Sequence, residues 1–346
     1  MRQNNRLAWE IGFFGPMPEV EEAEEPFDLG KIDLFSPPSP SRKYNTVLPR
    51  DGGVIHHLPA AANRSKESVW YISDFHLEFQ MEERGIEHTE AAVVDFIDGR
   101  IEEMLAGAPE RSGVLLCGGD VSHSVALTTL FYDRLCGRWQ GPVLAVVGNH
   151  ELWDNQPRGT AHPRAVGEIL ADYRRHIDRS GAEDLRRAML EDDVYVRFPD
   201  GRGRRIREEQ VLAASDEDLQ EVLHEASVVV LGGNGFTGLN PRYNASLGMY
   251  RDSLTDVEED RALSTRFQAV YNKVRRVAGE EPVIVFTHTP TKNWSADDYA
   301  PRWVYISGHT HQNTFLFRED GATVLADNQI GYTDRPWYLC GVAFDD

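Results

Sequence analysis

The chain of 346 residues is poor in cysteine, with Cys117, Cys136 and Cys340 as its three cysteines. A sparse, odd-numbered set does not form a disulfide framework and favours a reducing compartment. The sequence also lacks a run approaching the roughly 18 apolar residues of a membrane span. No basic segment followed by an apolar stretch stands at the N-terminus, so we expect no signal peptide, no membrane association and a cytoplasmic location.

Positive charge is scarce as well. Lys and Arg total 36 against 56 Asp and Glu, which gives a formal net charge of −20. An acidic surface repels phosphate backbones over long range, so general nucleic-acid binding is disfavoured. A small anionic substrate is not excluded, because bound metal ions set the local field. The composition leaves the oligomeric state open.

Residues 1–65 differ in composition from the rest of the chain. They hold an acidic run, Glu19–Glu25, and a proline and serine cluster, Ser36–Ser41. Because little periodicity indicates helix or strand, we interpret them as an N-terminal arm, partly disordered. A partner-binding strap is the alternative, which three aromatic residues would help: Trp9, Phe13 and Phe14. Residues 66–346 are then the main domain.

The main domain alternates apolar strands with amphipathic helices, an order that favours parallel central strands. We predict helices at residues 89–106, 125–136 and 256–278, and strands at residues 69–73, 114–117, 143–147, 228–231, 283–286, 303–307, 323–326 and 338–344.

Residues 152–226 interrupt this order and are rich in Arg, Asp and Glu. Helical spacing appears at Val166, Ile169 and Tyr173, and the stretch Asp200–Gly203 predicts a hairpin. We interpret the region as an inserted cap or lid beside the site. A solvated surface excursion is the alternative reading of so long an insertion.

Five polar motifs follow apolar strands directly: Asp74-x-His76, Gly119-Asp120, Gly148-Asn149-His150-Glu151, His288, and Gly308-His309-Thr310-His311. An Asp-x-His or His-x-His pair alone is common in turns and on surfaces, and Gly-Asn-His-Glu alone is a moderately specific signal. In α/β sheets, however, ligands gather outside the carboxyl ends of strands, so five distant segments can converge on one crevice. Oxygen and imidazole donors without thiolate suit Mn²⁺, Fe or Zn²⁺. The pattern therefore predicts a metal site.

The order of these motifs resembles that of the calcineurin-like metallophosphoesterases, which carry D-x-H, G-D, G-N-H-E/D, H and G-H-x-H. The resemblance covers about residues 69–330, and the stretch Ser73–Phe79 is similar to a bacterial and phage branch. The protein-phosphatase branch continues its second motif as Gly-Asp-x-Val-Asp-Arg-Gly. Here Gly119–Ser124 departs from that pattern, so this branch is disfavoured. The resemblance implies an α/β fold of two packed mixed β-sheets flanked by helices.

The resemblance also implies two divalent metal ions, Mn²⁺ first and Fe or Zn²⁺ as alternatives. One ion would be held by Asp74, His76, Asp120 and His311. The second would be held by Asp120, Asn149, His288 and His309. Asp120 would bridge the pair, since a carboxylate has two oxygens.

The implied reaction is hydrolysis of a phosphomonoester or phosphodiester. Two metal ions about 3.5–4 Å apart lower the pKa of a bridging water and clamp the phosphoryl oxygens, and the resulting hydroxide attacks phosphorus. His150 is expected near the leaving oxygen as the general acid, and Glu151 is expected to orient a histidine. Three residues are candidate substrate contacts: Asn149, Arg242 and Asn244. For Asn244 a turn-forming role is the alternative.

We expect a small or nucleotide-like phosphate ester as substrate, because the acidic surface disfavours long polyanions. A nuclease of the same family is the alternative enzyme. A non-catalytic scaffold is the alternative outside catalysis. Such proteins usually lose metal ligands or the acid histidine, and this chain retains all of them.

Overall fold

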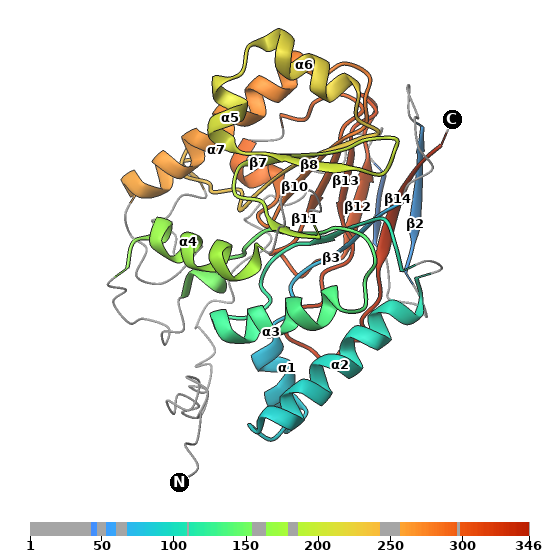
Figure 1. Cartoon of the computed structure of the whole chain (residues 1–346), viewed down its shortest axis with the longest axis vertical. Helices are drawn as coiled ribbons and strands as arrows, with labels where there is room; N and C mark the ends of the chain where they lie inside the picture. Colours follow the sequence, from blue (N-terminus) through green and yellow to red (C-terminus); the bar gives the residue numbers. More distant parts are fainter. Residues whose placement is uncertain are drawn as a thin grey trace.

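The computed structural model describes residues 43–46, 53–59, 68–108, 111–153, 164–178, 186–242, 257–295 and 298–345. These residues form two mixed β-sheets that pack face to face, with helices over both outer faces (Figure 1). The predicted α/β architecture of two packed sheets flanked by helices is confirmed.

The six-stranded sheet has the strand order β2-β14-β3-β4-β5-β6. Its strands are β2 (Ile55–Pro59), β14 (Cys340–Asp345), β3 (Val69–Ile72), β4 (Val114–Cys117), β5 (Val143–Ala145) and β6 (Arg187–Met189). Strands β3 to β6 run parallel, whereas β14 runs antiparallel to β3. The carboxyl ends of β3, β4 and β5 therefore meet at one edge of the sheet.

The eight-stranded sheet has the order β1-β12-β13-β11-β10-β9-β7-β8. Its strands are β1 (Lys43–Thr46), β12 (Thr314–Phe317), β13 (Thr323–Ala326), β11 (Val304–Ser307), β10 (Val283–Thr287), β9 (Val228–Gly233), β7 (Asp193–Arg197) and β8 (Gly203–Ile206). Strands β9, β10, β11 and β13 are parallel, and antiparallel strands continue the sheet at both ends.

Successive residues of the central strands face different layers. In β4, Val114 and Leu116 belong to the core between the two sheets, whereas Leu115 and Cys117 pack against helices. Strand β10 divides its residues in the same way between the inner core and the opposite helical layer. Because both faces of these strands are buried, their sequences are continuously apolar rather than alternating.

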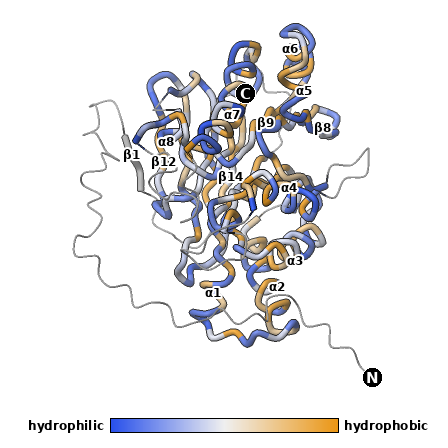
Figure 2. Tube along the Cα trace, turned by 90° about the vertical axis from the view of Figure 1, so that its left-hand side faces the viewer, coloured by the Kyte–Doolittle hydropathy of each residue, from blue (hydrophilic) through white to orange (hydrophobic). Residues whose placement is uncertain are grey.

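One helical layer packs on the six-stranded sheet: α1 (Leu77–Glu83), α2 (Glu90–Ala106), α3 (Val125–Cys136) and α4 (Val166–Ile177). The other packs on the eight-stranded sheet: α5 (Glu208–Ala213), α6 (Asp216–His224) and α7 (Val257–Val277). Figure 1 shows these two groups on opposite sides of the strands. Hydrophobic and hydrophilic residues are interleaved along α3, α4 and α7, as a helix with one buried face requires (Figure 2).

Two short helical segments lie beside the loops that follow the strands: a 3₁₀ turn (Glu151–Trp153) and α8 (Thr291–Ser295). In the described part of the chain, no helix has the length and apolarity that a membrane crossing demands.

Most predicted elements are confirmed, with ends that differ by at most two residues. The three predicted helices are α2, α3 and α7. Side chains cap the first two, since Thr89 accepts the backbone N–H of Ala92 and Ser124 accepts that of Leu127. Such caps satisfy amide groups that the first helical turn leaves without partners.

The expectation of neither helix nor strand before residue 65 is wrong at two places. Strand β2 pairs with β14 in the six-stranded sheet, and β1 pairs with β12 in the other. These short sheet-edge strands depend on partners that are distant in the sequence, so their local pattern carries little signal. The remainder of residues 1–65 lies outside the described residues, and the domain boundary near residue 65 stays a prediction.

Residues 152–226 do not stand apart from the sandwich where the structure describes them. The predicted helix is α4, and the predicted hairpin joins β7 to β8. Strand β6, however, extends the six-stranded sheet, and β7 and β8 extend the other. This part of the region builds both sheets and is no separate cap. Strand β8 is an edge strand with polar residues, so its sequence lacks the apolar run from which the central strands are predicted. Residues 154–163 and 179–185 of the predicted cap lie outside the described residues.

Leu144 tests the core between the sheets, because its side chain is fully buried there on β5. We expect Leu144→Ala to lower the free energy of unfolding by about 2–5 kcal/mol. The matched control is Leu212→Ala on α5, where Leu212 is 39% exposed, and its cost should stay near 0.5 kcal/mol. Denaturant unfolding measures both, and equal losses would contradict the packing described.

Candidate metal centre

The first group of predicted ligands forms a compact cluster at the strand ends. His76 and His311 are 235 positions apart in the chain, yet their Nε2 atoms lie 2.9 Å apart. His311 Nε2 is also 3.3 Å from Asp74 Oδ1. With Asp120, these residues offer ligand atoms that all lie within 4.8 Å of one another. The cluster is a candidate metal-binding group.

A second group of polar side chains also lies next to Asp120. The side-chain oxygen of Asn149 is 3.0 Å from His288 Nε2 and 2.9 Å from His309 Nδ1. Asp120 Oδ2 is 3.5 Å from His288 Nε2 and 3.7 Å from His76 Nε2. The carboxylate of Asp120 therefore lies between the two groups and approaches a histidine of each.

The backbone at these positions is strained. Five of the clustered residues have positive φ: Asp74 (60°), His76 (44°), Asp120 (51°), His309 (73°) and His311 (52°). Residues other than glycine rarely adopt this left-handed region, which costs of order 1–3 kcal/mol each. Such conformations persist only where the surrounding structure enforces them, and they cluster at functional sites. Here they turn side chains from separate strand ends toward one point.

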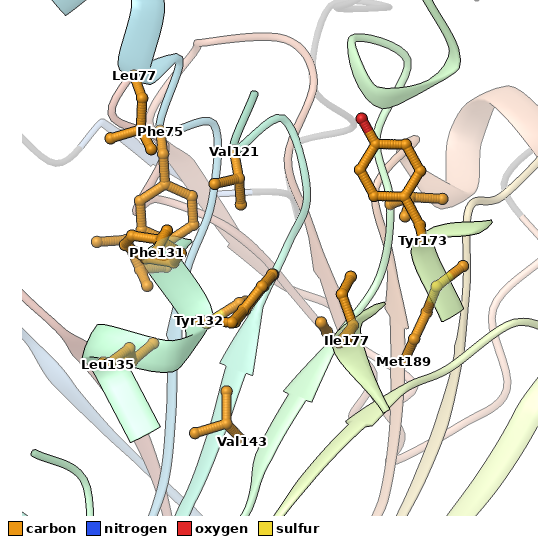
Figure 3. Packing of buried hydrophobic residues seen from close by; sticks show 14 of the residues in the cluster. Phe75, Leu77, Val121, Phe131, Tyr132, Leu135, Val143, Tyr173, Ile177 and Met189 are labelled. Atoms are coloured by element: carbon orange, nitrogen blue, oxygen red, sulfur yellow. The ribbon is translucent and has the colours of Figure 1, made fainter. Parts of the chain in front are cut away.

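Buried apolar residues anchor the loops that carry the first two motifs, Asp74-x-His76 and Gly119-Asp120. Phe75 stands between Asp74 and His76, and its ring lies 4.7 Å from that of Phe131 and 5.2 Å from that of Trp337. Figure 3 shows Phe75 with Val121, which follows Asp120, in the same hydrophobic cluster. The polar ligands and their apolar neighbours are thus directed to opposite sides of each loop.

Glu151 ties two of the loops together. Its carboxylate accepts backbone N–H groups from Gly148 at 2.8 Å, Asp120 at 3.0 Å and Val121 at 2.8 Å. Burial raises the pKa of Glu151 to about 7 despite these hydrogen bonds. Its observed partners are main-chain amides rather than the histidine side chain that we expected.

Burial also favours the neutral form of three histidines of the cluster. It lowers the pKa of His76 and of His309 to about 3, and it lowers that of His288. Neutral imidazole is the form that binds metal. His288 Nδ1 lies 2.8 Å from the carbonyl oxygen of Gly118. Because a carbonyl only accepts, Nδ1 carries the proton and Nε2 is left facing Asn149 with its lone pair.

The two carboxylates respond differently to burial. Burial, with the charges of Glu151 and Asp74, raises the pKa of Asp120 well above its usual value. Burial alone would raise the pKa of Asp74 too, but the hydrogen bond with His311 brings it below the usual range. A buried carboxylate among neutral imidazoles is costly unless a cation compensates it. The donor set therefore fits bound divalent metal.

His150 lies beside the ligand cluster. Its side chain is 3% exposed, and Nε2 is 4.0 Å from Asp120 Oδ2. Its backbone N–H donates to Asp120 Oδ1 at 2.8 Å, and its Nε2 lies 3.0 Å from the hydroxyl of Tyr332. Burial lowers the pKa of His150 well below its usual value. The residue borders the shared carboxylate without joining either group of donors.

The family of the chain follows from these motifs taken together. A model of the calcineurin-like phosphoesterase family matches residues 68–313, a range that contains all five motifs. The chain belongs to the calcineurin-like phosphoesterase family. With its candidate metal-binding group, this calcineurin-like phosphoesterase is a metal-dependent phosphoester hydrolase.

Similarity to solved structures adds little to this family assignment. The crystal structure of a phosphopantetheinyl hydrolase from Mycobacterium tuberculosis is 13% identical, with 80% of this chain and 95% of that chain covered and a TM-score of 0.42. A likeness at this level carries no argument about the substrate. No curated protein sequence matches the chain significantly.

Of the three predicted substrate contacts of this phosphoesterase, the structure describes two. Asn149 lies in the cluster, as described above. Arg242 lies exposed in a turn, where its backbone N–H donates to Asn240 Oδ1 at 3.0 Å. Asn244 lies outside the described residues, and substrate roles for both stay predictions. Sequence reasoning missed Tyr332, because a single tyrosine in a connecting segment gives no motif or spacing to recognise.

Asp120→Ala should remove most of the bound divalent metal, because this carboxylate approaches both groups of donors. Elemental analysis of purified protein measures the change. Asp298→Ala is the matched control, since Asp298 is exposed and pairs with Arg275 away from the cluster, and it should retain the metal of the unmodified protein. Equal metal content in the two variants would contradict the shared role of Asp120.

Proposed function

We propose that this phosphoesterase hydrolyses small phosphomonoesters or phosphodiesters at a centre for two divalent cations, with His150 as general acid. The observation that supports this most directly is the position of Asp120 Oδ2, at 3.7 Å from His76 Nε2 and 3.5 Å from His288 Nε2. A single carboxylate between two sets of donors suits a bridging ligand.

The proposed ligands divide into two sets that share this residue. The first is Asp74, His76, Asp120 and His311, and the second is Asp120, Asn149, His288 and His309. When bound, the two cations supply an activated water and neutralise charge on the phosphoryl oxygens. The mixture of carboxylate, amide oxygen and imidazole suits Mn²⁺, Fe or Zn²⁺. Asn149 contributes a neutral oxygen, which limits the negative charge of the site and leaves it able to take an anionic ester.

His150 is the residue that protonates the leaving oxygen in this proposal. Its Nε2 lies 4.0 Å from Asp120 Oδ2, within reach of an ester bound at the centre, and the negative charge of that ester would favour the protonated imidazole that burial otherwise disfavours. The backbone hydrogen bond to Asp120 and the contact with Tyr332 hold the imidazole from two sides. Proton transfer to a leaving alkoxide contributes about 10²–10⁴-fold to rate in enzymes.

A small substrate agrees with the charge of the chain. The net charge of −20 opposes the approach of long polyanions. We propose a small or nucleotide-like phosphate ester, and we keep the cytoplasmic location and the N-terminal arm of residues 1–65 as predictions.

A panel of esters tests the function. With Mn²⁺ added, we expect turnover of at least one of 4-nitrophenyl phosphate and bis(4-nitrophenyl) phosphate, and slower cleavage of single- or double-stranded DNA. Chelation should abolish the activity, and added Mn²⁺ should restore it, because the reaction depends on the cations. Protein that contains metal and turns over none of these compounds would speak against a phosphoesterase. Faster cleavage of DNA would favour a nuclease.

His150→Ala should keep the bound metal and lower kcat by about 10²–10⁴-fold, because the leaving oxygen loses its proton donor. His176→Ala on α4 is the matched control, since His176 is exposed, and it should leave both quantities unchanged. Steady-state kinetics with elemental analysis separates the two effects. If His150→Ala lost metal as fully as Asp120→Ala does, His150 would be a ligand and not the acid.

A further inference from the structure

Three aromatic side chains surround His150, and we refer to Phe79, Trp153 and Tyr332 as the aromatic collar. The ring of Trp153 stacks on the imidazole of His150 at 3.9 Å between centroids, with an interplanar angle of 30°. The rings of Phe79 and Tyr332 lie 5.8 Å from it. The three residues come from α1, from the 3₁₀ turn after the third motif, and from the segment between β13 and β14.

Tyr332 reaches both His150 and the first ligand group. Its ring lies 4.3 Å from that of His76 and 4.6 Å from that of His311, and its hydroxyl is 3.0 Å from His150 Nε2. In spite of these contacts, 44% of its surface stays exposed. Tyr332 therefore flanks the candidate centre and presents part of its side chain to solvent there.

The position of Tyr332 is built into the fold by the residues before it. Gly331 donates its N–H to the carbonyl oxygen of Asp74 at 2.8 Å, and Ile330 donates to that of Ser73 at 3.0 Å. Gln329 Oε1 accepts the N–H of His311 at 2.6 Å. Gln329 and Ile330 are both buried. The segment is thus fixed to the loops that carry the first and last ligands, although it lies beyond the range matched by the family model.

The collar lies within reach of the alcohol half of an ester in the proposed reaction. If His150 protonates the leaving oxygen, the atoms attached to that oxygen extend from His150. Apart from the ring of His76, at 4.4 Å between centroids, the aromatic rings described beside His150 are those of the collar. Aromatic faces stack on flat rings and discriminate weakly between ring types.

We propose that the aromatic collar selects phosphate esters whose leaving group carries an aromatic ring, with Tyr332 as the main contact. The inference rests on the proposed function and adds the chemical class of the leaving group. An aryl-bearing alcohol and a nucleoside share this chemistry. The hydroxyl of Tyr332 has the second role of positioning His150.

Matched pairs of esters test the selection. Benzyl and cyclohexylmethyl phosphate have similar size and leaving groups but differ in aromaticity. Adenosine 5′-phosphate and ribose 5-phosphate differ by the base. Each compound is assayed as a monoester and as its methyl diester, with metal-loaded full-length enzyme. We expect kcat/KM to favour the aromatic member of at least one pair by about tenfold, a size typical of stacking on one ring.

Variants of Tyr332 separate its ring from its hydroxyl. Tyr332→Ala should bring the aromatic preference, the ratio of kcat/KM between the aromatic and the non-aromatic ester of a pair, close to one. Tyr332→Phe should keep the preference and lower kcat for both members of a pair, because the ring remains and the contact with His150 is lost. Phe317→Ala is the control, since Phe317 on β12 is 42% exposed and its ring packs near Phe315 and His56. Phe317→Ala should change neither the aromatic preference nor kcat.

The outcomes distinguish this inference from the proposed function. An active enzyme without aromatic preference, or a Tyr332→Ala variant that loses rate equally on both members of a pair, would overturn the inference alone. Metal-loaded enzyme that hydrolyses no ester would overturn the proposed function and the inference with it. If Tyr332→Ala loses metal or unfolds, Tyr332→Leu decides, because it keeps apolar bulk without an aromatic face. Retention of the preference in Tyr332→Leu would refute the role of the ring.

Discussion

The structure depends on one buried charge, the carboxylate of Asp120. Burial and the charges of two nearby carboxylates, Glu151 and Asp74, raise its pKa. A buried carboxylate close to other carboxylates destabilises the fold unless a cation or a set of hydrogen-bond donors compensates its charge. The backbone N–H of His150 supplies one hydrogen bond. The remaining compensation falls to a cation, so metal binding and the stability of this edge of the sandwich are linked.

The same edge holds strain that the sandwich must support. The left-handed backbone at Asp74, His76, Asp120, His309 and His311 is unfavourable in isolation. It is maintained because the strands before these loops are buried on both faces and leave the loops little freedom. Hydrogen bonds between loops add to this. The carboxylate of Glu151 accepts the backbone N–H groups of Asp120 and Val121, and Gln329 accepts the backbone N–H of His311 in the last motif.

Sequence reasoning reached the parallel central strands and the convergence of the five motifs for a physical reason. Strands buried on both faces read as apolar runs, and polar ligands at their ends interrupt those runs visibly. Strands β6 and β8 lack that contrast, because edge strands carry polar residues and draw their stability from distant partners. Glu151 was found by its motif but its function was misread, since hydrogen bonds to main-chain amides leave no trace in sequence. Gln329 and Tyr332 stand in no motif, so their placement follows only from three-dimensional pairing.

The C-terminal segment that carries Gln329 and Tyr332 has a consequence for how the site can change. Gln329 fixes the backbone of His311, Gly331 binds the main chain of Asp74, and Tyr332 contacts His150. The candidate metal ligands, the proposed acid His150 and the exposed ring of Tyr332 are therefore joined through a few consecutive residues. A substitution that shifts this segment must move the ligand loops along with the aromatic contact, because close-packed interiors transmit small displacements. If the aromatic collar selects the leaving group as proposed, its preference is consequently easier to alter at the ring of Phe79 or of Tyr332 than in the backbone that carries them.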